Sequence, residues 1–457
     1  MTTQFTEAPI FDADQHMYET PDSLTKYLPE KYSRAVQFAQ FGRQTRIVIN
    51  NRVDDFIPNP TFERVAAPGA HEKFFAGENT EGLTLREMQG PGIDAPAATR
   101  NPVARVAELD RQGVVEVLNY PTLASLIEHA TADDPELTLA VIHALNQWML
   151  EHWTYNYENR VFSTPIINLS EVDGAQRELE YLLDNGVKVA LIKPGPVNGI
   201  RGWRSPALPE FDPFWRDVEA AGPPIVLHAS YPPLDDYVAK WEPPHTQNFM
   251  AQSAFRWMVL GHREVADMIT SLICHGTLTR FPRLRIASVE NGSSWIHPLL
   301  GDFEDLYRKM PQNFPEHPHD VFRRNIWVSP FWEGCVADVV ETVGWDRVLF
   351  GSDYPIPKAW QNRGDSGSTP KAWMHVVPTT SWATTRAGSW VCRSPTPTPA
   401  PSSRLPWRTR NLQSEVTARR RRDRHSRDLP GLHGGPRLGR SCSHAGRRRL
   451  DPRRSVL

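Results

Sequence analysis

The sequence has few cysteines and no long hydrophobic segment. Only four cysteines occur among 457 residues, and no two of them form a CxxC pair. These features argue against a disulfide framework and against a cysteine-ligated zinc site. No apolar run approaches the roughly 20 residues that a membrane-spanning helix needs, and the polar start MTTQFTEAP does not resemble a signal peptide. We therefore expect a cytoplasmic protein without a membrane partner.

The net charge of −2 conceals two very different parts of the chain. The segment from 361 onward holds 20 Lys and Arg but only 5 Asp and Glu, which leaves 31 basic and 48 acidic residues before it. From about 356 aliphatic residues are sparse, and stretches such as SPTPTPAPSS and RRRR show no apolar periodicity. Such a composition cannot bury enough apolar surface to fold, so we expect a disordered basic tail over 356–457. Because this tail has no recognition motif, we expect no specific nucleic-acid binding.

Before the tail, apolar strand-like runs alternate with amphipathic segments of helical length. This alternation predicts βαβ units and a parallel sheet, an α/β fold over 1–355. Eight strands are predicted, the number that a closed (β/α)₈ TIM barrel needs. They are expected at 8–14, 114–120, 162–168, 187–193, 223–228, 285–290, 325–329 and 347–353. Helices are expected at 135–157, 173–185, 209–221, 249–270 and 334–344.

One segment, 19–106, does not fit this repeat. It is rich in Pro and Gly, carries several aromatic residues, and contains a hairpin pattern around Asn50-Asn51. An insertion after strand 1 lies on the C-terminal face of a barrel, where the active site is found, so we expect it to wall the pocket. The alternative is a surface excursion remote from the chemistry.

Acidic and histidine residues close three of the predicted strands. Asp14 and His16 end FDADQH, His228 ends PPIVLH, and Asp353 ends RVLFGSD. Asp14 and His16 are two positions apart, so they face the same side of an extended strand. Carboxylate and imidazole are common ligands of divalent metals. Each residue alone is more often structural, but their recurrence at three strands predicts a mononuclear metal site at the barrel rim.

Two carboxylates are candidates for proton transfer. Glu290 closes the sixth strand and is either a further ligand or a general acid/base, with an ion pair to Arg285 or to another arginine at the rim as the structural alternative. Asp353 either coordinates the metal directly or accepts a proton from a bound water.

Three further residues are candidates for binding substrate. Lys193 ends the fourth strand and is expected either to hold an anionic group of the substrate or to reach solvent. Trp295 and Trp332 lie just beyond strands 6 and 7, where an aromatic pocket wall and ordinary packing are both open. His275 follows Cys274 within an apolar helix expected at 264–278 and is interpreted as a core or helix-end residue.

Four segments together resemble a known group of enzymes. They are FDADQH, PPIVLHAS, RFPRLRIASVENGSSWI and RVLFGSDYP, and they are similar to the amidohydrolase superfamily. The closer similarity, over about 8–355, is to its amidohydrolase-related branch, which includes relatives of aminocarboxymuconate-semialdehyde decarboxylase. The resemblance implies a (β/α)₈ barrel with one catalytic divalent metal ion, and either hydrolysis or non-oxidative decarboxylation. Zinc is the expected ion and manganese the alternative.

The resemblance also implies where the ligands lie. It gives Asp14 and His16 the ligand places of strand 1, His228 that of strand 5 and Asp353 that of strand 8. Two departures stand out, because many members have His-x-His where this chain has Asp14, and the decarboxylases have a His where this chain has Glu290. Decarboxylase chemistry is therefore not inherited directly.

The tail has a specific explanation. Related sequences continue GSDYP with a segment like His-Pro-Glu-Gly, whereas this chain continues with IPKAWQNR. By the genetic code, one extra C before the codons of that stretch allows it to be read as His-Pro-Glu-Gly-Leu-Ala-Glu-Pro. We therefore interpret 356–457 as out-of-frame translation, which removes the helix expected after strand 8 and exposes apolar surface.

Taken together, these patterns predict a metal-dependent hydrolase. A metal-activated water would attack a small carbonyl- or carboxylate-bearing substrate, with Asp353 or Glu290 moving the proton. One alternative is decarboxylation of an aromatic or unsaturated acid on the same metal. Another is an inactive or binding-only barrel caused by the altered C-terminus. The partner is a small molecule, and the oligomeric state, including a homo-oligomer, stays open.

Overall fold

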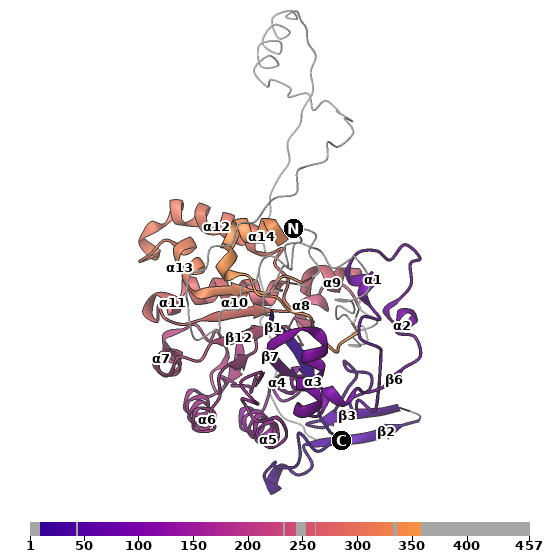
Figure 1. Ribbon diagram of the computed structural model, residues 1–457. Helices are drawn as coiled ribbons and strands as arrows, with labels where there is room; N and C mark the ends of the chain where they lie inside the picture. Colours follow the sequence, from indigo (N-terminus) through magenta and orange to yellow (C-terminus); the bar gives the residue numbers. More distant parts are fainter. Residues whose placement is uncertain are drawn as a thin grey trace, which may run out of the picture. The chain divides into compact units, whose positions relative to one another are not determined.

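The structure is a computed structural model that describes residues 10–42, 44–231, 234–243, 253–260, 262–331 and 336–357 (Figure 1). All of them belong to one compact unit of the chain, Met1–Cys392. The predicted tail lies outside the described residues except for its first two positions. Within the described ranges, no helix has both the length and the apolar character that crossing a membrane requires.

Among the described residues, seven parallel strands form two sheets. The first pairs β1 with β7 and β7 with β8, and the second runs in the order β9, β12, β13, β14. A parallel bridge between Ile166, just after β8, and Leu191 of β9 joins the two sheets. The strands are β1 (Ile10–Met17), β7 (Val114–Pro121), β8 (Val161–Ser163), β9 (Ala190–Ile192), β12 (Ile225–His228), β13 (Ile286–Val289) and β14 (Ile326–Val328).

An eighth segment closes the ring between β14 and β1. Val348 forms a parallel bridge with Val328, and Tyr354 forms one with Gln15. The strand predicted at 347–353 is thus present as isolated bridges instead of a continuous ladder. Its last residue, Asp353, has a left-handed backbone (φ 58°), which an extended strand does not adopt. With eight segments around the ring, the fold is the predicted (β/α)₈ barrel.

Helices follow the strands and lie outside them, with α5, α6 and α7 side by side on one flank (Figure 1). The longer helices are α3 (Pro102–Gln112), α4 (Ala124–Ala130), α5 (Pro135–Trp153), α6 (Val172–Asp184), α7 (Asp212–Ala221), α9 (Ala254–Leu260), α10 (Arg263–Cys274), α12 (Ile296–Lys309), α13 (Pro318–Asn325) and α14 (Val336–Val343). Shorter elements are α8 (Asp235–Val238), α11 (Thr277–Arg280), β10 (Val197–Gly199) and β11 (Gly202–Arg204).

Local sequence explains where these helices begin and end. The side chain of Asn101 accepts a hydrogen bond from the backbone N–H of Ala104 (3.1 Å), and Pro102 takes the first turn of α3. Gly113 ends the same helix in a left-handed conformation (φ 69°), which costs glycine little. The chain can therefore enter β7 directly after the helix.

Two of the helix predictions need correction. The helix predicted at 249–270 lies partly outside the described residues, and its described part is split into α9 and α10. The helix expected at 264–278 ends at Cys274, because Gly276 adopts a left-handed backbone (φ 76°) and starts the separate helix α11. His275 is therefore the C-cap residue of α10.

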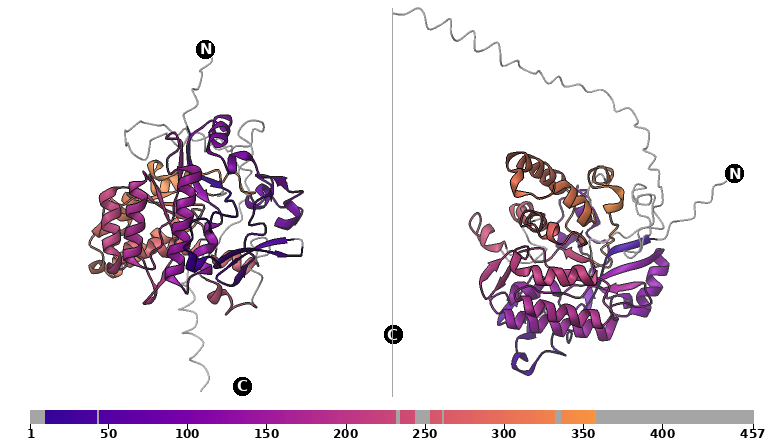
Figure 2. Two further views of the ribbon diagram at one scale, coloured as in Figure 1. Left: turned by 90° about the horizontal axis from the view of Figure 1, so that it is seen from below. Right: turned by 90° about the vertical axis from the view of Figure 1, so that its left-hand side faces the viewer.

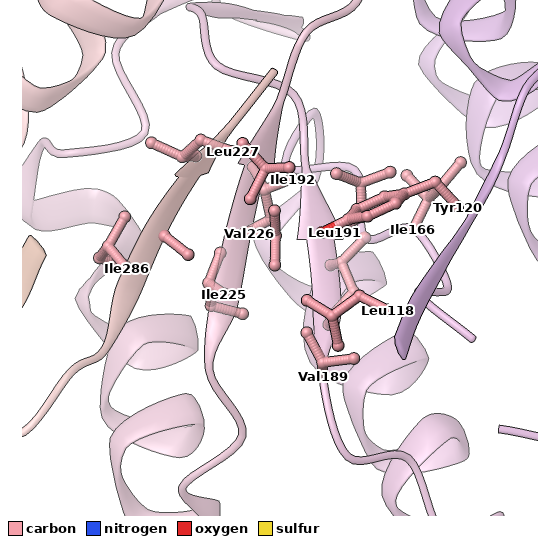
Figure 3. Close-up of a cluster of buried hydrophobic side chains, with 14 of the residues drawn as sticks. Leu118, Tyr120, Ile166, Val189, Leu191, Ile192, Ile225, Val226, Leu227 and Ile286 are labelled. Carbon is pink, nitrogen blue, oxygen red and sulfur yellow. The ribbon is translucent and has the colours of Figure 1, made fainter. Parts of the chain in front are cut away.

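The core is formed by the strands and the helix faces that cover them. All four residues of β12 and all four of β13 are buried, as expected for parallel strands covered on both faces. Figure 3 shows buried side chains of neighbouring strands packed together, including Leu118, Leu191, Val226 and Ile286. This packing gives the strand ends a rigid frame.

The insertion after β1 contains two small antiparallel sheets. In the first, Asn50 (φ 50°) and Asn51 (φ 61°) form the two-residue turn between β3 and β4, which confirms the predicted hairpin. The elements are β2 (Val36–Phe41), β3 (Gln44–Ile49), β4 (Arg52–Asp54), β5 (Arg64–Val65), β6 (Ile93–Asp94), α1 (Glu72–Phe75) and α2 (Leu85–Met88). Figure 1 and the left view of Figure 2 place these indigo and purple strands on the opposite side from α6 and α7.

Candidate metal centre and cavity

The four predicted ligands meet at one end of the barrel. Nε2 of His16 lies 3.5 Å from Oδ1 of Asp14 and 3.4 Å from Oδ1 of Asp353. Nε2 of His228 lies 3.5 Å from the same Asp14 oxygen. Oε2 of Glu290 lies 3.3 Å from Nε2 of His228, so a fifth side chain joins the group. Four widely separated parts of the sequence thus present their polar atoms to one small volume.

The two histidines have contacts that orient their rings. Nδ1 of His228 lies 2.8 Å from the carbonyl oxygen of Ala229, and a proton on Nδ1 leaves the lone pair of Nε2 facing Asp14. Nδ1 of His16 lies 3.3 Å from the hydroxyl of Thr122. In both rings Nε2 is therefore the atom that faces the carboxylates.

The donor set suits a divalent cation. Among the described residues, Oδ1 of Asp14 and Nε2 of His228 are buried and form no hydrogen bond. Buried polar atoms of this kind usually have a partner, and a metal ion can supply it. Asp14, His16 and His228 offer ligand atoms within 4.8 Å of one another, as do His16, Glu290 and Asp353. Carboxylate and imidazole ligands together fit zinc or manganese.

The charges of the carboxyl groups at the site also favour a bound cation. Burial raises the pKa of the Asp14 carboxyl, but the adjacent His16 and His228 rings outweigh this effect and hold that pKa below its ordinary value. Burial and the nearby charges of Asp14 and Asp12 raise the pKa of Asp353 well above its ordinary value. The carboxyl groups therefore repel one another unless a positive charge lies between them.

Backbone conformations at the site are unusual. Glu290 (φ 60°) and Asp353 (φ 58°) are both left-handed, which costs a residue other than glycine on the order of 1–3 kcal/mol. Close to them, the backbone of Gly351 approaches Asp14, and a Cβ at position 351 would lie 2.8 Å from the Asp14 Cβ. The strand 8 segment is therefore fitted tightly around the first ligand.

A buried arginine supports the first strand from behind. Nε of Arg105 donates to the Ala98 carbonyl (2.7 Å), Nη1 to Oε1 of Gln15 (2.9 Å) and Nη2 to the His16 carbonyl (2.5 Å). Its burial lowers its pKa to about 10, so it stays charged at neutral pH. Arg105 therefore connects the insertion, α3 and the ligand-bearing end of β1.

A buried tyrosine packs against both histidine rings. Tyr120, near the end of β7, has its ring centroid 4.3 Å from that of His228 and 5.7 Å from that of His16. The residue is fully buried. Neither Tyr120 nor Arg105 was predicted from the sequence, although Tyr120 ends a strand at the same rim as the ligands.

The site opens into a cavity of about 330 Å³. His16, His228, Glu290 and Asp353 lie in its wall. Much of the remaining wall comes from the insertion, which contributes Phe56, Ile57, Pro58, Asn59, Phe62, Arg64, Val65, Ala66, His71 and Gln89. Apolar side chains dominate this set, so the cavity suits a small and largely apolar ligand with a polar end.

The predicted substrate-binding residues have different positions. Lys193 lines the cavity and is only 9% exposed. Trp295 does not line it, because its ring packs in the core near Phe322 and its indole N–H donates to the Gly292 carbonyl (2.9 Å). Trp332 lies outside the described residues. For Trp295 the structure therefore favours the packing alternative.

The structure also bears on two alternative interpretations from the sequence, which concern Arg285 and His275. Arg285 precedes β13 and donates to the Gly222 carbonyl, whereas Glu290 follows that strand at its other end. The length of β13 therefore separates Arg285 from Glu290, and the alternative of an ion pair between Glu290 and another arginine at the rim stays open. His275 caps the end of α10, with Nδ1 2.9 Å from the Ser271 hydroxyl, as expected for a helix-end residue.

Comparison with known proteins identifies a family and several similar chains. The family model for amidohydrolases matches residues 70–372. A solved amidohydrolase from Mycobacterium avium subsp. paratuberculosis is 32% identical, with a TM-score of 0.73 over 77% of this chain and 91% of that one. Gamma-resorcylate decarboxylases of Rhizobium radiobacter and Rhizobium sp. (strain MTP-10005) are each 25% identical over 214 residues, which is 43% of this chain.

The chain matches 61% of the length of these two curated relatives. The amidohydrolase match, in contrast, covers most of the barrel, from the insertion to the end of strand 8 and beyond. The solved relative is similar in both fold and sequence. The chain therefore belongs to the amidohydrolase family of enzymes.

Proposed function

We propose that this protein is a metal-dependent decarboxylase of a small, largely apolar carboxylic acid. The observation that carries the proposal is the group Asp14, His16, His228 and Asp353, of which the last three line a mostly apolar cavity. The two curated relatives are decarboxylases by name, which favours this chemistry over hydrolysis. Because the chain matches only 61% of the length of these relatives, the substrate must be identified by experiment.

The same four side chains would hold the ion. Zinc and manganese both suit this ligand set. When bound, a divalent ion polarises a carboxylate or carbonyl oxygen and stabilises the negative charge that develops during the reaction. We place the carboxylate of the substrate at this end of the cavity, and its apolar body against the insertion side chains such as Phe56 and Phe62.

Decarboxylation then needs one proton. The bond between the carboxylate carbon and its neighbour breaks, CO₂ leaves, and the electron pair stays on the neighbouring carbon, which takes up a proton. We propose Glu290 as the donor, because it lines the cavity and its Oε2 lies 3.3 Å from Nε2 of His228. Asp353 is the alternative donor, and a proton from solvent restores either acid.

Hydrolysis at the same site is the second candidate. It is favoured by Glu290, because a carboxylate beside a metal is suited to take a proton from water. In that case an ester, lactone or amide would be the substrate.

One experiment separates the two. Metal-loaded protein is incubated with a panel of hydroxybenzoates, including 2,6-dihydroxybenzoate, and with a panel of aryl esters and lactones. We expect CO₂ and the corresponding arene in equal amounts, and no release in the Asp14→Asn/His228→Gln double variant. Ester or lactone cleavage without CO₂ from any acid would establish the hydrolase instead.

A further inference from the structure

A second polar group lies in the wall of the same cavity and plays no part in the metal centre. It consists of Lys193, which directly follows β9, and Glu128, which lies on α4. The two residues also line a smaller neighbouring cavity together with Asn168. Glu128 and Lys193 therefore lie between the two cavities, and a substrate in the main cavity can contact them.

The charge of Lys193 is already matched. The attraction of Lys193 opposes the burial that raises the pKa of Glu128, and Asn168 donates to Oε1 of Glu128 (2.6 Å). Glu264 on α10 is also within electrostatic range of Lys193, and burial raises its pKa to about 8. At neutral pH Glu264 is therefore mostly protonated, so Glu128 is the carboxyl group that offsets the charge of Lys193 and leaves no surplus positive charge for an anion.

We propose that Glu128 and Lys193 form a specificity subsite for a neutral hydrogen-bonding group of the substrate, such as a hydroxyl, and exclude a second carboxylate. This inference rests on the proposed function, since it assumes that an acid occupies the cavity. A hydroxyl can donate to the carboxylate of Glu128 while it accepts from the ammonium of Lys193. A second carboxylate would meet the negative charge of Glu128 in a poorly solvated wall.

The subsite changes the role predicted for Lys193. Alone, a buried lysine would attract an anionic group. Beside Glu128, it supplies one half of a donor and acceptor pair. Sites that are built to hydrogen-bond a hydroxyl reject analogues without one much more strongly than apolar pockets reject an extra methyl group.

Binding of matched acids tests the inference. The probes are benzoate and its 3- and 4-substituted hydroxy, methyl and carboxy derivatives, titrated calorimetrically into metal-loaded protein. We expect the better hydroxy isomer to bind at least tenfold more tightly than the methyl and dicarboxylic acids of the same substitution pattern. Equal affinity for the hydroxy and methyl acids, or tighter binding of the dicarboxylic acid, would overturn the proposal.

Variants assign the effect to the two residues. Glu128→Gln keeps the shape of the side chain, and we expect it to bind the dicarboxylic acid about tenfold more tightly than the wild type does. Lys193→Met should weaken binding of the hydroxy acid about tenfold more than it weakens binding of benzoate. The exposed Lys188→Met is the matched control and should change none of these affinities.

The proposed function and the subsite fail in different ways. Absence of metal from the purified protein would count against the proposed function. A metal-loaded protein that binds benzoate but does not distinguish the derivatives would overturn the subsite alone. If no acid binds to metal-loaded protein, the subsite is likewise overturned. Dicarboxylate binding that is lost in Lys193→Met would instead make Lys193 an anion site.

Discussion

Oδ1 of Asp14 lies 3.5 Å from Nε2 of His228, although one residue belongs to the first strand of the barrel and the other to the fifth. Only closure of the ring brings these strand ends together. Both atoms are buried and form no hydrogen bond among the described residues. A cation between them would satisfy both at once, and this relationship is the basis of the proposed metal centre.

Gly351 gives a test of the site that leaves every ligand in place. In Gly351→Ala the new methyl group would lie 2.7 Å from the Ser329 hydroxyl and 2.8 Å from the Asp14 Cβ, so Asp14 must move. We expect zinc affinity, measured by titration calorimetry, to fall at least tenfold. Gly301→Ala is the control, because its methyl group meets nothing within 4 Å and should stabilise helix α12 by about 0.5–1 kcal/mol. Unchanged zinc affinity in Gly351→Ala would contradict the close fit around Asp14.

Arg105 is expected to contribute strongly to stability. Arg105→Met removes three hydrogen bonds, including the one to the His16 carbonyl, and should lower the free energy of unfolding by about 3–5 kcal/mol. Arg111→Met on the same helix removes an exposed arginine and should change it by less than about 0.5 kcal/mol. Denaturant unfolding of both variants provides the comparison. Equal effects would show that the buried network adds little.

Glu19 predicts a pH-dependent stability. It is fully buried, and although Leu123 N–H donates to it (2.7 Å), burial raises its pKa from 4.5 to about 7. Between these two values the unfolded chain has released the proton while the native state keeps it. The contribution of Glu19 to the free energy of unfolding is therefore fully present below pH 4.5 and is lost as the pH rises to about 7. Above that pH it no longer changes.

The variant Glu19→Gln removes this pH dependence. Relative to the wild type, its free energy of unfolding should gain on the order of 3 kcal/mol between pH 4.5 and about 7. Denaturant unfolding across this range measures the difference. A difference that stays constant, or that shrinks with rising pH, would mean that the native protein holds Glu19 ionised.

Glu290→Gln distinguishes a proton-transfer role from a ligand role. If Glu290 supplies the proton, kcat should fall about 10²- to 10⁴-fold while the metal content and KM change little. If Glu290 is a ligand, the variant loses metal. Steady-state kinetics together with elemental analysis of the same sample separate the two roles.

The sequence predicted the strand ends because the relevant signal is local. An apolar run that ends in an acid or a histidine, as in FDADQH or PPIVLH, specifies both the strand and the side chain at its end. The eight strand positions and the hairpin at Asn50-Asn51 could be predicted for the same reason. The left-handed backbone of Glu290 and Asp353 could not, since it depends on contacts across the barrel.

Other features depend on tertiary contacts that no local pattern reveals. A charged residue on a helix is usually solvent-exposed. The sequence therefore did not indicate that Arg105 is buried behind the first strand or that Glu128 lines the cavity. Trp295 was a candidate for the pocket wall from its place after a strand, with ordinary packing as the alternative, and its ring packs in the core. The residues from 358 onward lie outside the described structure. Their out-of-frame origin stays a prediction, which resequencing of the locus tests.

The metal content of the purified chain tests the central claim most directly. Elemental analysis of the wild type should find about one zinc or manganese ion per chain. The Asp14→Ala/His228→Ala double variant should contain none while it remains folded by circular dichroism. A wild type without metal that cannot be loaded with zinc or manganese, or a double variant that keeps the same metal content, would contradict the proposed metal centre.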